Sequence, residues 1–271
     1  MSIFNRIKVF QVLFLVIMLS SCTGSDSDNA KSVKTDLESD NVFGSVKMIE
    51  LVEYGGMDTI FNTLKYDSLG YVREVITNNG IHQYRKLNKD NQLIKTLNIN
   101  SEGDTVSQLI NEYSNGNLNR TVEIINSEVT KEWKYVYYPD GRKKEMIILH
   151  EGEELARYEY SFSEDKNEEI VKVFRDVDSI HQEVMTVNIG DSIVKVNNKM
   201  YLKKSLKFNT NQVYYCDEFQ NYIKIIETQG QDTLFTAYYQ YEFDNKNNWL
   251  VKKQVFGDST IVKARRKIVY Y

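Results

Sequence analysis

The segment Tyr239–Trp249 reads Tyr-Gln-Tyr-Glu-Phe-Asp-Asn-Lys-Asn-Asn-Trp, and the rest of the chain repeats this unit. Aromatic residues alternate with polar ones, Asp and Asn then mark a turn, and a second strand begins at Trp249. Alternation with a period of two is typical of a β-strand that has one packed face and one solvated face. The segment therefore predicts a β-hairpin.

Copies of this hairpin recur along the chain. One turn type follows an aromatic or apolar residue, in copies that begin at Tyr66, Leu87, Tyr113, Tyr138, Phe162 and Phe208. A second turn type has Asp before Thr or Ser, or Asp-Ser-Thr, and then an apolar residue, at Asp58, Asp104, Asp178, Asp191, Asp232 and Asp258. The spacing of about two dozen residues matches one hairpin per repeat. We therefore predict an all-β, antiparallel hairpin-repeat array that forms an extended, twisted and curved sheet, either open or a partial barrel.

The last residues belong to this array by the same reasoning. Val262, Ala264, Ile268 and Tyr270 share one parity, interrupted only by Arg266. We predict that residues 250–271 form a strand pair packed on the preceding hairpin. Lys263, Arg265 and Lys267 share a face of the last strand, which indicates a charged edge strand that discourages aggregation. The alternative for these three residues is a site for an anionic glycan or lipid headgroup.

The strongest aromatic alternation marks a candidate ligand surface. Its residues share strand faces and are Trp133, Tyr135, Tyr137, Tyr158, Tyr160, Tyr239 and Tyr241. Sugars stack on such rings, which makes carbohydrate binding one reading. The other reading is structural, because aromatic cross-strand pairs stabilise sheets by ~0.2–1 kcal/mol each.

The N-terminus has the pattern of a targeting segment. Residues 1–21 contain a basic start at Arg6 and Lys8, followed by an apolar core over residues 9–19. That core is shorter than the ~20 apolar residues that span a bilayer, so we predict a signal peptide. Residues 22–42 are mostly polar and predict a flexible tether, which leaves residues 43–271 as the repeat domain.

Two resemblances follow from these patterns. Leu19-Ser20-Ser21-Cys22 resembles the lipobox of bacterial lipoproteins, which implies cleavage before Cys22 and acylation of Cys22 with chains such as palmitate. The turn pattern over most of residues 60–271 is similar to the tyrosine–aspartate repeats of the Rhs family and to hairpin repeats of Bacteroidetes lipoproteins. These resemblances imply a membrane-anchored envelope protein, facing the periplasm or the cell surface at the outer membrane, with a repeat sheet and no catalytic residues.

The sequence offers little evidence for enzyme chemistry. His82, His150 and His181 show no metal-ligand spacing, and no phosphate loop or nucleophile elbow is present. The Asp turns could bind calcium, but each offers one or two carboxylates where calcium takes six or more oxygens. Cys216 is expected to be a buried thiol. The net charge of −4 argues against a nucleic-acid partner. We expect no enzyme activity, cofactor or metal.

The leading functional hypothesis is non-catalytic binding or scaffolding at the cell envelope, through the concave face of the repeat sheet. An envelope protein or a glycan is the expected partner. One alternative is a carrier that shelters a lipid or another apolar ligand. The other is a glycan-processing enzyme, which would need two carboxylates about 5–10 Å apart in one cleft.

Overall fold

The computed structural model describes residues 35–271, except residues 56–58, 166, 176–179, 191 and 203–204. Cys22 and the predicted signal peptide lie outside the described residues. The described residues all belong to one compact unit. This unit contains an 18-stranded antiparallel sheet and the short helix α2, Asp36–Ser39. The strands are β1 (Val46–Tyr54), β2 (Thr59–Tyr66), β3 (Val72–Thr77), β4 (His82–Leu87), β5 (Leu93–Ile99), β6 (Thr105–Ser114), β7 (Asn117–Ile125), β8 (Glu128–Tyr137), β9 (Lys143–His150), β10 (Glu153–Ser163), β11 (Glu168–Arg175), β12 (Ile180–Ile189), β13 (Ile193–Leu202), β14 (Ser205–Cys216), β15 (Tyr222–Gln229), β16 (Asp232–Phe243), β17 (Trp249–Phe256) and β18 (Ser259–Tyr270).

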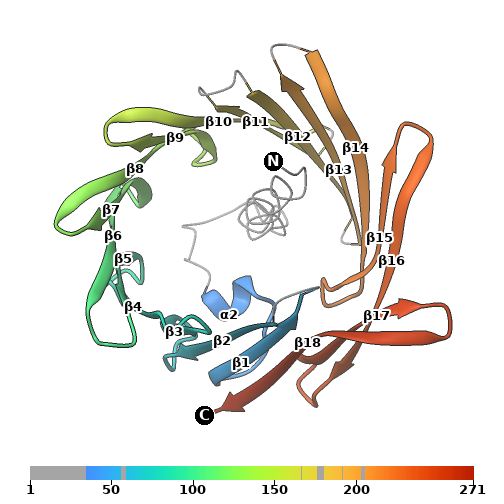
Figure 1. Cartoon of the computed structure of the whole chain (residues 1–271), viewed down its shortest axis with the longest axis horizontal. Helices are drawn as coiled ribbons and strands as arrows, with labels where there is room; N and C mark the ends of the chain where they lie inside the picture. Colours follow the sequence, from blue (N-terminus) through green and yellow to red (C-terminus); the bar gives the residue numbers. More distant parts are fainter. Residues whose placement is uncertain (1–34, 56–58, 166, 176–179, 191, 203–204) are drawn as a thin grey trace. The chain divides into compact units, whose positions relative to one another are not determined.

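The sheet closes on itself (Figure 1). Each strand pairs with the next one along the chain, and β18 pairs with β1 through contacts such as Ile49 with Ile268. The predicted open sheet is therefore wrong, and the partial barrel was the nearer alternative. The physical reason is that strand twist and tilt accumulate over many hairpins until the first and last strands meet, which removes both sheet edges.

The C-terminal strands complete the ring. The predicted strand pair over residues 250–271 is confirmed, because β17 pairs with β16 and β18 pairs with β17. The predicted edge strand is wrong, because β18 has neighbours on both sides. The Lys267 side chain forms an ion pair of 3.2 Å with Glu50 of β1.

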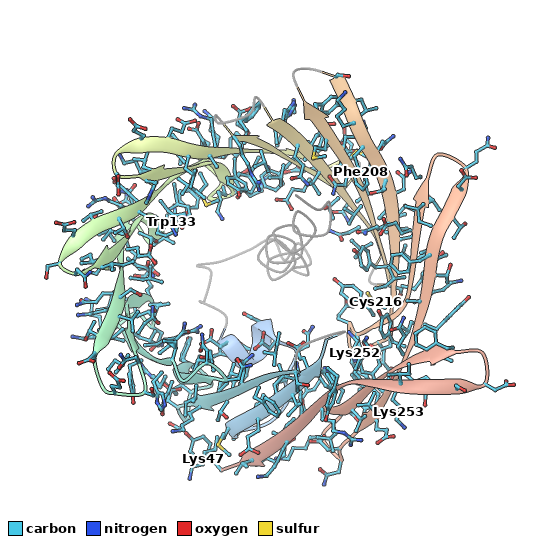
Figure 2. All side chains as sticks on the ribbon, viewed as in Figure 1. Lys47, Trp133, Phe208, Cys216, Lys252 and Lys253 are labelled. Atoms are coloured by element: carbon cyan, nitrogen blue, oxygen red, sulfur yellow. The ribbon has the colours of Figure 1, made fainter. Side chains whose placement is uncertain are left out.

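The two faces of the closed sheet are here called the inner wall and the outer wall. Figure 2 shows Lys252 directed to the inside of the ring, and Lys253 and Lys47 directed to the outside. Paired residues of antiparallel strands place their side chains on the same face, and successive residues alternate. The register can thus be followed around the whole ring, and it places Arg85 on the inner wall. There Arg85 reaches Asp36 of α2 at 3.7 Å, in agreement with the position of α2 inside the ring.

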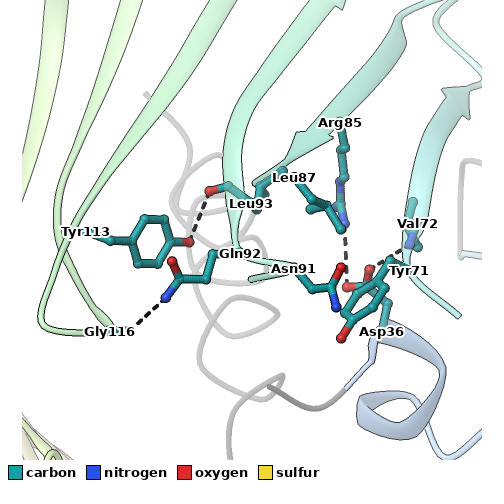
Figure 3. Close-up of a pocket in the computed structure, with 10 residues that line it drawn as sticks. All are labelled: Asp36, Tyr71, Val72, Arg85, Leu87, Asn91, Gln92, Leu93, Tyr113 and Gly116. Atoms are coloured by element: carbon teal, nitrogen blue, oxygen red, sulfur yellow. Dashed lines mark hydrogen bonds and ion pairs between the residues drawn. The ribbon is translucent and has the colours of Figure 1, made fainter. Parts of the chain in front are cut away.

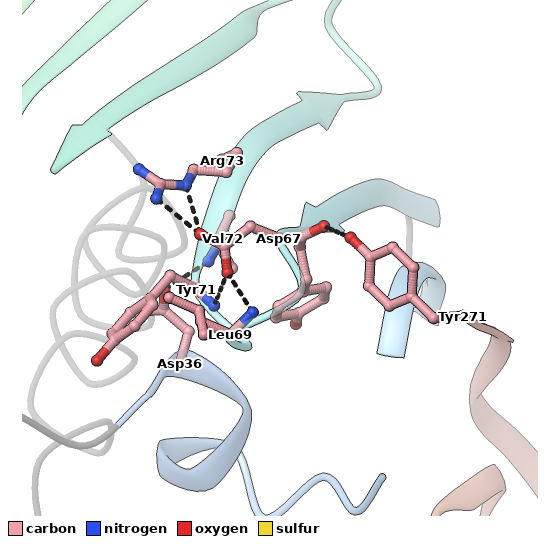
Figure 4. A network of polar contacts seen from close by, with 8 residues as sticks. Asp36, Asp67, Leu69, Tyr71, Val72, Arg73 and Tyr271 are labelled. Carbon is pink, nitrogen blue, oxygen red and sulfur yellow. Dashed lines mark hydrogen bonds and ion pairs between the residues drawn. The ribbon is translucent and has the colours of Figure 1, made fainter. Parts of the chain in front are cut away.

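The predicted turns form because side-chain oxygens replace missing backbone acceptors. Asp67 Oδ1 accepts hydrogen bonds from the Leu69 and Tyr71 backbone N–H groups, both at 3.0 Å, and Asp67 Oδ2 pairs with Arg73 (Figure 4). The same i+2 and i+4 pattern is present at Asn88, Asn100, Asp217 and Asp244.

One predicted turn is placed differently by the structure. The segment Phe208–Val213, predicted as a turn, lies inside β14. Its asparagines bond across strands instead, with Asn197 Nδ2 donating to Asn209 Oδ1 at 2.9 Å and to Asn211 Oδ1 at 2.8 Å.

The end of the predicted tether is folded. Residues 22–42 were predicted to be flexible, but Thr35 caps α2 with a capping box, and Leu37 and Val42 are buried against β1 and β3. Phe43 is fastened to the turn between β16 and β17. Its N–H donates to Asn248 Oδ1 at 2.7 Å, and its carbonyl accepts from Asn248 Nδ2 at 2.8 Å. Burial of two apolar side chains and paired polar groups stabilises this segment, although its composition is mostly polar.

Candidate binding surface on the inner wall

All the residues of the predicted ligand surface lie on the inner wall, but in two separate places. Tyr135 and Tyr158 both pair with Met146 of β9, so Trp133, Tyr135, Tyr137, Tyr158 and Tyr160 form one group, the β8–β10 cluster. The remaining pair lies on β16, where Tyr239 pairs with Gln254 and Tyr241 with Lys252. With Trp249 of β17 and Arg266 of β18, this pair forms the β16–β18 cluster. The structure therefore brings five of the seven residues together and leaves two elsewhere on the ring.

Each cluster contains a lysine that the sequence did not single out. In the β8–β10 cluster, Lys143 Nζ lies 5.5 Å from the centre of the Tyr135 ring and 5.3 Å from that of Tyr160. Burial lowers the pKa of Lys143, and Glu169 partly opposes this effect. The pKa of the Glu169 carboxyl is itself raised by burial. Aromatic faces attract cations, so each ring pair favours the charged lysine against its desolvation.

The β16–β18 cluster holds two cations. Lys252 Nζ lies 4.7 Å from the centre of the Tyr239 ring and 6.0 Å from that of Tyr241. The Arg266 guanidinium carbon lies 3.7 Å from the centre of the Trp249 ring. Burial lowers the pKa of both cations. The sequence pattern could have located Arg266, because it is the one charged residue among the alternate, otherwise mainly apolar positions 262–270 of the last strand.

Some of the aromatic residues have a structural task. The hydroxyl of Tyr137 donates to the Leu118 carbonyl at 2.8 Å, and that of Tyr241 donates to the Tyr222 carbonyl at 2.9 Å. Tyr113 makes the equivalent bond outside the predicted surface. Each of these bonds connects the strand that precedes one turn to the strand that follows the previous turn at the same rim. They commit the Tyr137 and Tyr241 hydroxyls to the scaffold.

The outer wall carries most of the cross-strand ion pairs, although it also has aromatic contacts such as the stacked rings of Phe174 and His181. Its strands are joined by ion pairs such as Lys65–Glu74 at 2.6 Å and Arg157–Glu145 at 3.0 Å. The register places charged side chains outward on strands around the ring, including Glu50, Glu74, Lys95, Glu112, Arg120, Glu132, Glu159, Lys172, Glu183, Lys199, Lys224, Glu242, Lys253 and Lys267. On the lipid face of a transmembrane barrel, Arg or Lys costs ~2–4 kcal/mol near the bilayer midplane. The charged side chains of this wall therefore favour contact with water.

A separate pocket of about 250 Å³ lies where α2 meets the inner wall (Figure 3). Its polar groups largely bond one another: Arg85 pairs with Asp36, and Gln92 Nε2 donates to the Gly116 carbonyl at 3.0 Å. None of the predicted surface residues lines it. The pocket therefore reads as part of the attachment of α2.

No group of three or more His, Cys, Asp and Glu that could hold a metal is found in the described part of the chain. The carboxylates of Asp67 and Asp244, in turns of the first type, accept backbone N–H bonds. Cys216 is buried with 7% exposure at the end of β14, as predicted. No helix among the described residues is long and apolar enough to cross a membrane.

Comparisons with known proteins give likenesses of low identity. No protein-family model matches the chain, and no curated protein matches it. Among solved structures, a porin-like protein from Bacteroides uniformis is similar at 11% identity and TM-score 0.45, over 83% of this chain and 96% of that one. A porin-like protein from Bacteroides vulgatus is similar at 8% identity and TM-score 0.43, over 83% and 98%. The TcdB2-TccC3-TEV structure matches at 9% identity and TM-score 0.23, over 74% of this chain and 16% of that one. At these values the likenesses do not indicate what this chain does.

Proposed function

We propose that this chain is a lipid-anchored cell-envelope protein that binds an apolar or amphipathic molecule within its closed sheet, without catalysing a reaction. The observation that carries the proposal is the division of the two walls. Aromatic side chains gather on the inner wall, while cross-strand ion pairs join the outer wall. Burial of apolar ligand surface contributes roughly 25 cal/mol per Å². A wet outer wall with an aromatic inner wall suits a carrier better than a membrane pore.

The number of strands supports the same proposal. Barrels of about eight strands are filled by their own side chains or hold one small ligand, whereas those of 16–18 strands enclose a wider space. A closed sheet of 18 strands therefore supports an inner compartment that its own side chains do not fill. The half-buried state of Trp133, Tyr135 and Tyr239 leaves part of each ring available for contact.

The proposed anchor is acylated Cys22. A chain from residue 22 to residue 35 reaches at most about 45 Å when fully extended. Thr35 lies beside Gly70, at the rim that carries the turn at Asp67, so this rim would face the membrane. Cys22→Ser is expected to abolish acylation and to release the protein from the membrane fraction. A mutant that stays acylated and membrane-bound would refute the anchor without touching the binding proposal.

Intrinsic fluorescence provides the test of binding. The chain has two Trp residues, Trp133 and Trp249, and the register places both on the inner wall. Titration of the full-length acylated protein in detergent with N-phenyl-1-naphthylamine, a neutral apolar fluorophore, should quench the tryptophan emission by energy transfer. Trp133→Phe and Trp249→Phe variants would assign the signal to one cluster. Solvent extraction of the natively purified protein should yield a stoichiometric apolar molecule. Absence of both signals would contradict the proposal.

A further inference from the structure

The β16–β18 cluster carries positive charge without a paired anion. Neither Lys252 nor Arg266 forms an ion pair with any other described residue, and Arg266 Nε is buried with no hydrogen-bond partner in the structure. Two other inner-wall cations do form ion pairs, Arg85 with Asp36 at 3.7 Å and Lys131 with Glu123 at 3.6 Å, although Arg85 Nε is also buried without a hydrogen-bond partner. A cation removed from water without a partner is costly. The chain keeps two of them side by side across neighbouring strands.

Two carboxylates lie near this pair without forming an ion pair with it. Asp40 and Glu53 act electrostatically on Arg266, and Glu53 also acts on Lys252. Burial raises the pKa of Asp40, so this carboxyl loses its charge at a higher pH than usual. Lys263 adds positive potential at Lys252. Lys252 and Arg266 thus lie close together on the inner wall, and no carboxylate of the described residues forms an ion pair with either of them.

Apolar side chains adjoin the two cations. Lys252 pairs with Ala264, which is 3% exposed, and Arg266 pairs with Leu51 of β1. Ile268 follows Arg266 on the inner face of β18. Trp249 and Tyr241, also on the inner wall, have ring centres 6.1 Å apart. The cations are thus set in an apolar and aromatic surface.

We infer that Lys252 and Arg266 form the headgroup site for an anionic amphiphile, whose carboxylate or phosphate lies between the two cations and whose tail lies along the inner wall. This inference rests on the proposed function and specifies the ligand class. A guanidinium offers a planar pair of donors to two oxygens of an anion, and an ammonium adds a point charge. The anion would supply the partner that Arg266 Nε lacks.

Binding of four probes to the full-length protein in detergent tests the inference. Palmitate carries both an anion and a tail, hexadecanol carries only the tail, hexadecylamine carries a cation, and inorganic phosphate has no tail. Tryptophan emission and the shift in unfolding temperature report binding. We expect palmitate to bind at least about ten-fold more tightly than hexadecanol, a difference of ~1.4 kcal/mol. Hexadecylamine and phosphate should bind most weakly.

Paired variants locate the site. Lys252→Met and Arg266→Gln should remove the preference for palmitate and leave hexadecanol binding unchanged. Lys253→Met is the matched control, because Lys253 is the next residue and faces outward (Figure 2). Lys224→Met is a second control, because Lys224 lies over two tyrosine rings, Tyr215 and Tyr238, at 5.3 and 5.2 Å on the outer wall. Lys252→Arg keeps the positive charge and should therefore retain the preference for palmitate that Lys252→Met loses. This comparison keeps the test valid if Arg266→Gln does not fold.

The possible results separate the two proposals. Equal binding of palmitate and hexadecanol would overturn the headgroup site and leave the carrier intact. An equal loss in Lys253→Met or Lys224→Met would also overturn it, since the effect would then come from net charge. Phosphate binding as tight as palmitate would show a site for a free anion. If no probe with a tail binds, both proposals fail.

Discussion

Lys252 and Lys253 are neighbours in the chain and have the same chemistry, yet they lie in opposite environments. Lys253 forms an ion pair with Glu242 on the outer wall, whereas Lys252 lies over tyrosine rings on the inner wall and its pKa is lowered by burial. The tyrosines divide in the same way. Those with raised pKa values, such as Tyr158, Tyr160 and Tyr241, face inward. Successive residues of a strand face opposite walls, so a shift of the strand pairing by one residue would exchange the solvated and the desolvated side chains.

The largest effect is expected from opening the ring. Deletion of residues 250–271 removes β17 after its first residue and all of β18, so β16 and β1 both lose a partner. The inner wall should then become accessible, with loss of hydrogen-exchange protection in β1 and β2 as well as in β15 and β16. Loss confined to the C-terminal strands would show that the seam between β1 and β18 contributes little.

Alkaline pH should destabilise the inner wall next. Burial raises the pKa of Tyr137 from 10.0 to about 12, and that of Tyr270 to about 12 with a further contribution from Asp244. Because the unfolded chain loses these protons first, stability should fall as pH rises from 10 through 12. Lys143 and Lys252 act in the opposite direction, since burial lowers their pKa values and favours the neutral form. Urea midpoints at a series of pH values measure the balance, and a flat profile would contradict burial of the tyrosines.

A matched tyrosine pair compares the walls directly. Tyr158 is 7% exposed on the inner wall, and Tyr238 is 47% exposed on the outer wall. Tyr158→Ala should lower the free energy of unfolding by about 3–5 kcal/mol, as for other buried aromatic residues. Tyr238→Ala should cost below ~1 kcal/mol, because most of the ring stays in water. Equal losses in urea unfolding would mean that the outer wall is covered by something else.

The smallest effect belongs to the outer ion pairs. Lys65→Met removes the pair with Glu74, in which the Lys65 side chain is 45% exposed. Exposed pairs contribute ~0.2–1 kcal/mol and are screened by salt. The variant should therefore lose little stability in urea unfolding, and the difference should vanish at high salt. A loss of several kcal/mol would indicate that this wall is buried.

Local sequence patterns predicted the hairpins and their faces well. Alternation placed Trp133, Tyr135 and Tyr137 on one face, and the Asp67 turn formed through the hydrogen bonds expected of Asp. Composition gave a wrong prediction at Phe208–Val213, which was expected to be a turn and lies within β14. Its asparagines bond across strands, but asparagine is also a common turn residue. Composition failed again at Leu37 and Val42, where two apolar residues in a polar stretch suffice to dock a segment.

The closure and the lysine sites could not be read from one sequence. Ile49 and Ile268 meet across the seam, but no local signal relates residues so far apart in the chain. Without closure, the concave face had no defined neighbours, so Lys143 and Lys252 looked like ordinary surface lysines. Their meaning depends on which rings stand on the adjacent strands, and that depends on the register of the whole sheet.

The pairing of β1 with β18 also determines when the ring can close during synthesis. Residues 46–54 leave the ribosome long before residues 264–270, with which they pair. Until those last residues arrive, the growing chain is a strip whose aromatic side is open to water, a state that favours aggregation. Sequence separation slows the formation of such a contact more than it weakens it, since loop-closure entropy grows only with the logarithm of length. The inner compartment therefore comes into existence in one late step, and every chain that ends early lacks it.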